Sequence, residues 1–113
     1  MPATNKRSYA RYTLAAATLL GQNVALERRN RKMTAQDLAD RLGITRHTLR
    51  RIEQGDPKVE LGLAFEACTL LGIALFGGDR GRIEQEIRTG ARHLALLPQA
   101  ARPRSAKGND DDF

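Results

Sequence analysis

The chain has 113 residues, a net charge of +6 and one cysteine, and this length suffices for one domain with a modest core. Because Cys68 is the only cysteine, an internal disulfide and a cysteine-based zinc site are excluded. The charge is uneven: residues 1–52 hold 11 Lys/Arg against 3 Asp/Glu, whereas residues 53–113 hold 8 against 10. The basic half favours an anionic partner, although many soluble domains are also basic.

Apolar and polar residues do not alternate as they do in β-strands, so the hydrophobic pattern predicts an all-α chain. Residues 1–8 are expected to form a disordered basic arm, and residues 9–97 one helical domain. A first helix is predicted from about Tyr9 to Lys32, with Leu20, Val24 and Arg28 on one face.

Two further helices are predicted close together. Thr34 and Asp37 have the spacing of a capping box, which starts a helix that Gly43 then ends. Thr45 can cap the next helix only two residues later, and Gly55 ends it before the turn at Asp56-Pro57. Helices joined by so short a turn indicate a helix-turn-helix unit.

The outward face of the helix between Thr45 and Gly55 carries four polar side chains, while its opposite face carries Leu49 and Ile52. Such a rod of donors suits the major groove of DNA, where arginine can bind guanine O6 and N7. The alternative is a solvated, arginine-rich helix without a ligand. The four side chains are Arg46, His47, Arg50 and Arg51.

The helix predicted over 61–71 is apolar on nearly all faces, so it requires burial on more than one side. A subunit interface can supply the second side, with Leu63 and Leu70 in it. A last helix over 80–97 adds a stripe that includes Ile83 and Ile87. Residues 98–113 are expected to be a disordered tail.

The stretch "MTAQDLADRLGITRHTLRRIEQGDP" resembles the Cro/CI-type (XRE) helix-turn-helix family over about residues 20–73. Through "GDPKVELGLAFE", "LALLP" and the terminal "DDDF", the chain is also similar to HipB-like antitoxins, which are encoded beside HipA-type kinase toxins. The resemblance implies a five-helix, lambda-repressor-like fold, here with an N-terminal helical extension. It also implies a homodimer on an inverted repeat of double-stranded operator DNA, and a HipA-like kinase toxin as partner. The alternative is a stand-alone XRE-family regulator without a toxin.

The same resemblance assigns roles to residues. It implies a structural ion pair between Arg28 and Glu53. The family commonly has Gln where this chain has Ala35, so Gln36 or Arg31 substitutes for its phosphate contact or the contact is missing. Base-facing candidates are Arg46, His47 and Arg51, and the phosphate or mixed contacts are Thr45, Thr48 and Arg50. Thr34 and Gln36 are further DNA-binding candidates.

The acidic end of the tail has two interpretations. Asp110, Asp111, Asp112 and Phe113 can bind the toxin, or the acids only keep the tail solvated and off the DNA. Three consecutive acids on a flexible tail do not make a rigid metal site, and no catalytic constellation is visible. We therefore expect no enzyme, no metal and no cofactor. The N-terminus lacks an apolar leader, and the longest apolar run is too short for a membrane span of about 20 residues, so a cytoplasmic protein without membrane contact is expected.

Overall fold

The computed structural model describes residues 8–99, and every regular element in that range is a helix. The helices are α1 (Arg11–Asn30), α2 (Ala35–Leu42), α3 (Arg46–Glu53), α4 (Leu61–Leu70) and α5 (Arg80–Leu96). The all-α class and the five predicted helices are confirmed. The predicted arm, apart from Ser8, and the tail from residue 100 onward lie outside the described residues.

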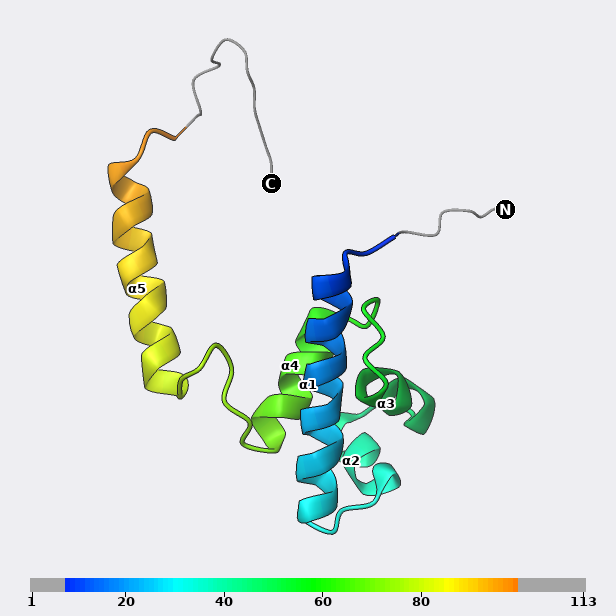
Figure 1. The fold of residues 1–113 in the computed structure, drawn as a ribbon. Coiled ribbons are helices and arrows are strands. Elements are labelled where there is room, and N and C mark those ends of the chain that lie inside the picture. Colours follow the sequence, from blue (N-terminus) through cyan, green and yellow to red (C-terminus); the bar gives the residue numbers. More distant parts are fainter. Residues whose placement is uncertain (1–7, 100–113) are drawn as a thin grey trace. The chain divides into compact units, whose positions relative to one another are not determined.

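The chain divides after Gly77 into two compact units, and the predicted helical domain over 9–97 spans both. The first unit contains α1 to α4, in which α3 contacts α1 and α2, and α2 also contacts α4 (Figure 1). The second unit contains α5, which begins at an Asp79 cap whose carboxylate accepts a hydrogen bond from the backbone N–H of Arg82 at 2.9 Å.

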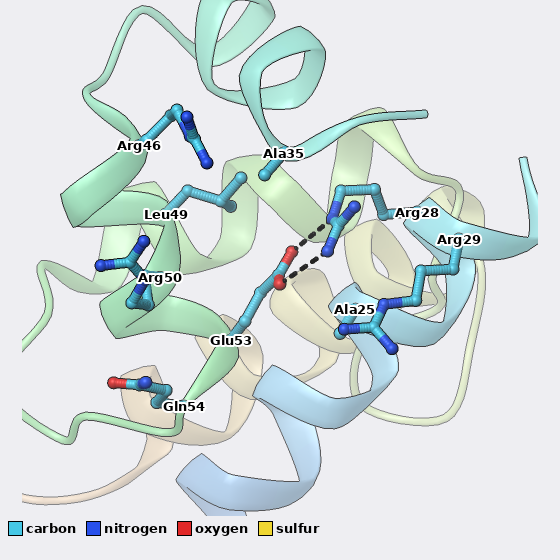
Figure 2. Close-up of a pocket in the computed structure, with 9 residues that line it drawn as sticks. All are labelled: Ala25, Arg28, Arg29, Ala35, Arg46, Leu49, Arg50, Glu53 and Gln54. Atoms are coloured by element: carbon cyan, nitrogen blue, oxygen red, sulfur yellow. Dashed lines mark hydrogen bonds and ion pairs between the residues drawn. The ribbon is translucent and has the colours of Figure 1, made fainter. Parts of the chain in front are cut away.

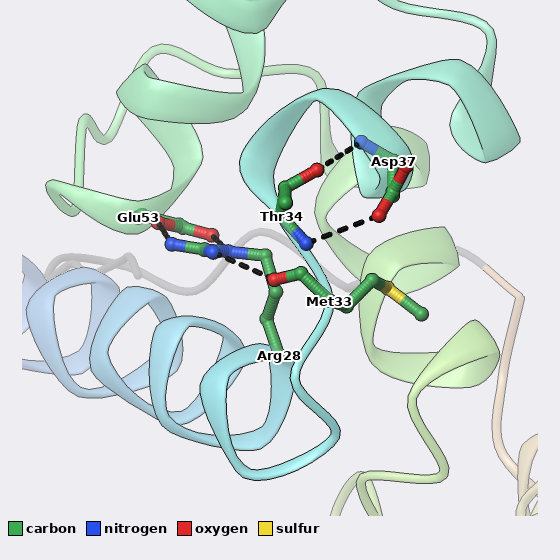
Figure 3. A network of polar contacts seen from close by, with 5 residues as sticks. All are labelled: Arg28, Met33, Thr34, Asp37 and Glu53. Carbon is green, nitrogen blue, oxygen red and sulfur yellow. Dashed lines mark hydrogen bonds and ion pairs between the residues drawn. The ribbon is translucent and has the colours of Figure 1, made fainter.

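The predicted helix boundaries of the helix-turn-helix are confirmed by their capping contacts. Thr34 Oγ1 accepts from the backbone N–H of Asp37 at 3.0 Å, while the Asp37 carboxylate accepts from the Thr34 N–H at 3.3 Å (Figure 3). Gly43 has a φ of 72°, the left-handed conformation that stops α2. Thr45 Oγ1 then accepts from the Thr48 N–H at 3.1 Å and starts α3.

The first helix is shorter than predicted at both ends. Its C-terminal end was placed too late because no stop signal precedes Thr34 in the sequence. The structure ends α1 at Asn30, and Lys32 takes the left-handed conformation with a φ of 57°. The backbone N–H of Met33 then returns to the carbonyl of Arg28 at 3.0 Å. Residues 11–18 precede the region of family resemblance and form the predicted N-terminal helical extension.

One apolar core holds the first unit together. It contains side chains from each of its four helices, all almost completely removed from solvent. Cys68 is a free thiol buried in this core. The buried apolar residues are Val24, Leu38, Ala39, Leu49, Ile52, Ala67, Cys68 and Leu71.

Two glycines allow α1 to lie directly on the end of α3. A Cβ atom at Gly21 would overlap the backbone carbonyl oxygens of Ile52 and Glu53. A Cβ at Gly55, whose φ is 79°, would lie 2.7 Å from Cα of Thr18. Because backbone meets backbone here, the position of α3 on the domain is set by α1.

Candidate nucleic-acid interface

The outer face of α3 presents the donors predicted from the helical wheel. Arg46, His47 and Arg50 are exposed, whereas Leu49 and Ile52 on the other face are buried. Among residues 8–99, no hydrogen bond or ion pair engages the side chains of these three exposed residues. They are therefore available to an incoming ligand.

Arg51 is different from the other arginines of α3. Its side chain is half-buried, and its Nε donates to Oδ2 of Asp56 at 2.7 Å. The other carboxylate oxygen of Asp56 accepts from the backbone N–H of Lys58 at 2.8 Å. The hydrogen bond from Lys58, followed by the hydrogen bond from Arg51, holds the pKa of Asp56 below its usual value. In the sequence, Asp56 indicates only a turn with Pro57, so its contact with Arg51 was not predicted.

The C-terminal end of α3 is tied to α1 by an ion pair between Arg28 and Glu53. The Nε and one terminal nitrogen of Arg28 donate to the two carboxylate oxygens of Glu53 at 2.7 and 3.1 Å (Figure 2). The remaining terminal nitrogen donates to the carbonyl of Met33 at 3.0 Å, just before the capping box of α2 (Figure 3). The hydrogen bond to Glu53 raises the pKa of Arg28.

Beside this ion pair is a basic pocket of about 350 Å³ between α1, α3 and the start of α2 (Figure 2). Arg29 of α1 lines it together with Arg46 and Arg50 of α3, and Glu53 supplies the only carboxylate of the lining. The arginines make the pocket suitable for an anion, such as a backbone phosphate. Arg29 was not predicted as a site residue, because its place beside α3 depends on how the two helices cross.

At the start of α2, the small side chain of Ala35 leaves space at the edge of the same pocket. The two residues suggested to replace the family's phosphate contact at this position both have their side chains engaged in hydrogen bonds. Gln36 donates to Asp40 within α2 at 2.8 Å. Arg31 donates to the carbonyl of Leu71 at 2.6 Å and pairs with Glu27. Thr34 is exposed, but its hydroxyl accepts the capping hydrogen bond.

The predicted dimerisation residues differ in exposure. Leu63 and Leu70 are half-buried and pack against the core of the first unit. In α5, Ile83 is half-buried and Ile87 is 64% exposed. The tail candidates Asp110, Asp111, Asp112 and Phe113 lie outside the described residues.

Thiol reactivity, metal binding and membrane spanning find little support in residues 8–99. Burial raises the pKa of the Cys68 thiol, which keeps it protonated and unreactive. In that range, no three His, Cys, Asp or Glu side chains are grouped so that they could hold a metal ion. None of the described helices is both long and apolar enough to cross a membrane.

A capped pair of short helices joined by a left-handed glycine, with arginines on the outer face of the second, defines an XRE-like helix-turn-helix protein. The family model described as "Helix-turn-helix domain" matches residues 19–75, just over half of the chain. The chain therefore belongs to the helix-turn-helix domain family and is a DNA-binding regulator. Neither a curated protein nor a solved structure matched the sequence.

Proposed function

We propose that this protein is a sequence-specific transcriptional repressor that inserts α3 into the major groove of its operator. The observation that carries the proposal is the group of exposed donors on a helix held firmly at both ends. Thr45 caps the start of α3, and the Arg28–Glu53 pair fixes its end on α1. A helix fixed in this way can present Arg46 at a constant position to the edges of the bases.

The side chains of α3 divide by where they lie. Arg46 and His47, on the exposed first turn, suit base contacts, together with Arg51. Arg50 borders the basic pocket with Arg29, a position that suits a phosphate contact. The further DNA contacts in the proposal are Thr34, Thr45 and Thr48. Gln36 would join them only by giving up its hydrogen bond to Asp40.

The proposed repressor acts as a homodimer on an inverted repeat, because one recognition helix reads one half-site. Several apolar side chains of α5 are exposed within the chain, including Ile87 at 64% and Leu94 at 72%. A second copy can cover this stripe, together with Leu63, Leu70 and Ile83 of the proposed interface. The half-sites should then lie about one helical turn apart, roughly 34–36 Å.

The finer proposal is that the repressor is the antitoxin of a type II toxin–antitoxin module. It rests on the resemblance to HipB-like antitoxins in "GDPKVELGLAFE" and at the tail. In this proposal the protein represses its own operon, and residues 110–113 dock on a HipA-like kinase toxin. A chain that lacks residues 109–113 should keep its operator affinity and lose binding to the co-encoded kinase. If no such kinase is encoded beside it, the protein is a stand-alone regulator.

Selection from a pool of randomised duplexes tests DNA recognition directly. The selected sequences should contain an inverted repeat, and binding measured by fluorescence anisotropy should weaken steeply with salt. The expected log–log slope is about −0.9 for each phosphate that the protein neutralises. Selection without any sequence preference, or an affinity that does not change with salt, would contradict the proposal.

A further inference from the structure

Among the three arginines of α3, only Arg51 is held by another side chain of the described residues. Its guanidinium and the Asp56 carboxylate are only about one-third exposed, with side-chain exposures of 37% and 30%. Ion pairs this close to the surface contribute little to stability in general. The main physical effect of the contact is therefore to fix the direction of a long and otherwise flexible side chain.

Asp56 is well suited to this role, because it is itself held in place. Its backbone N–H donates to the carbonyl of Arg51 at 3.0 Å, which ties the two residues together through the main chain. Its Oδ1 accepts from the Lys58 N–H at 2.8 Å, so only Oδ2 is used for the arginine. Pro57 after it restricts the backbone of the loop, and Gly55 before it packs closely against the backbone of Thr18 in α1.

The atom that Asp56 engages decides what Arg51 can still do. An arginine has five N–H donors, and the contact with Asp56 uses the single donor on Nε. Both terminal amino groups stay free of acceptors among residues 8–99. Together they form the planar fork that matches O6 and N7 of guanine in the major groove.

We propose that Asp56 is a positioning residue that directs the terminal amino groups of Arg51 toward a guanine of the operator. This inference rests on the proposed DNA recognition by α3. It adds a specificity-determining residue that lies outside the recognition helix. The opposite role, in which Asp56 withholds Arg51 from the DNA, predicts a different result in the same experiment.

The decisive variant is Asp56→Asn. The Asn Oδ1 can still accept from Lys58, which preserves the turn, but its amide N–H₂ then faces Arg51 and offers no acceptor. Glu60→Gln is the matched control, since it removes one negative charge from the same loop at an exposed residue. Arg51→Ala identifies the base pair that Arg51 reads, as the position of the selected operator where preference is lost.

Discrimination is measured as the ratio of affinities for the selected operator and for duplexes substituted at that base pair. Asp56→Asn should lower this ratio about two- to tenfold, which corresponds to losing the pre-organisation of one side chain. Glu60→Gln should leave the ratio unchanged. In an Arg51→Ala background, where this ratio is already lost, Asp56→Asn should change the operator affinity no more than Glu60→Gln does. A merely structural role for Asp56 would still lower the operator affinity in that background.

Three results would overturn the inference while leaving DNA recognition intact. They are an unchanged ratio in Asp56→Asn, an operator affinity that Asp56→Asn still lowers in the Arg51→Ala background, and an operator affinity of Asp56→Asn that rises above that of Glu60→Gln with discrimination retained. The last would show that Asp56 withholds Arg51. A wild-type protein that selects no sequence would instead overturn the proposed function, and the inference with it.

Discussion

Arg28 of α1 and Glu53 of α3 form a two-pronged ion pair whose side chains are only 10% and 14% exposed. Replacing Arg28 by Ala should leave the Glu53 carboxylate without its partner in a largely dry site. We expect the free energy of unfolding to fall by about 3 kcal/mol, because a stranded charge costs more than a lost surface contact. The corresponding loss in melting temperature is more than about 10 °C.

Arg29→Ala is the matched control for this change, because the neighbouring side chain is exposed and makes no ion pair among the described residues. Its melting temperature should stay close to that of the wild type. If Arg28→Ala has the same melting temperature as Arg29→Ala, the ion pair does not stabilise the fold.

The close approach of α1 to α3 predicts a second loss of stability. Gly21→Ala places a methyl group against the carbonyl oxygens of Ile52 and Glu53, so the helices must move apart. Overpacking of this kind costs about 1–3 kcal/mol. Thermal denaturation followed by circular dichroism measures the change.

Gly62→Ala in α4 serves as the control and should raise the stability of the protein instead of lowering it. A Cβ at Gly62 meets nothing within 4 Å, and alanine is the better helix former by up to about 1 kcal/mol. If both variants melt at the same temperature, the two helices do not pack through Gly21 as closely as the structure shows.

The helix boundaries could be predicted from sequence because they depend on neighbours in the chain. Thr34 with Asp37, Gly43, and Thr45 each act within a few residues, so their spacing alone reveals their roles. The apolar face of α3 follows from helical periodicity for the same reason. By contrast, α1 ends at Asn30 and is followed by Lys32 in the left-handed conformation, for which the sequence carries no glycine signal.

The sequence-based predictions were incomplete where a side chain's role depends on contacts between elements. A helical wheel places Arg51 on the same arc as Arg46, and it cannot show that the loop after Gly55 returns a carboxylate to only one of them. Arg29 borders the pocket because α1 crosses α3 closely at Gly21. Arg31 donates a hydrogen bond to the carbonyl of Leu71, which lies 40 residues away in the chain.

The lowered pKa of Asp56 gives a pH dependence with a definite sign. Because the folded protein stabilises the charged form, the carboxyl group should titrate below the 3.8 usual for aspartate. Its contribution to stability is then fully present above about pH 3.8 and is lost as the pH falls through the lower, folded-state pKa. Carboxyl carbon shifts in NMR measure that titration.

Comparison with Asp56→Asn isolates this contribution. The difference in unfolding free energy between the wild type and the variant should be constant in neutral solution and shrink in acid. Asp40→Asn, an exposed aspartate on α2, provides the control for a general charge effect. An Asp56 midpoint at or above 3.8 would contradict the contacts with Lys58 and Arg51.

Arg46 should carry base specificity, because it is exposed on the first turn of α3 and has no partner within the described residues. Arg46→Ala should weaken operator binding by about 1–3 kcal/mol and relax the preference at one base pair. Arg92→Ala removes the same charge from α5 and should leave that preference intact. Equal losses on the operator and on random DNA for Arg46→Ala would assign Arg46 to a phosphate instead.

The proposed dimer is best tested at Ile87. A glutamate at Leu70 would disturb the monomer as well, since Leu70 packs against the core of the first unit. Ile87 is 64% exposed within the chain, so Ile87→Glu should leave the fold intact and place an unpaired charge in the interface. Sedimentation velocity should then show a shift from dimer to monomer. The control Gln85→Glu introduces the same glutamate at another exposed position of α5, and this variant should remain dimeric. A full dimer for Ile87→Glu would remove Ile87 from the interface, and a monomeric wild type would refute the homodimer itself.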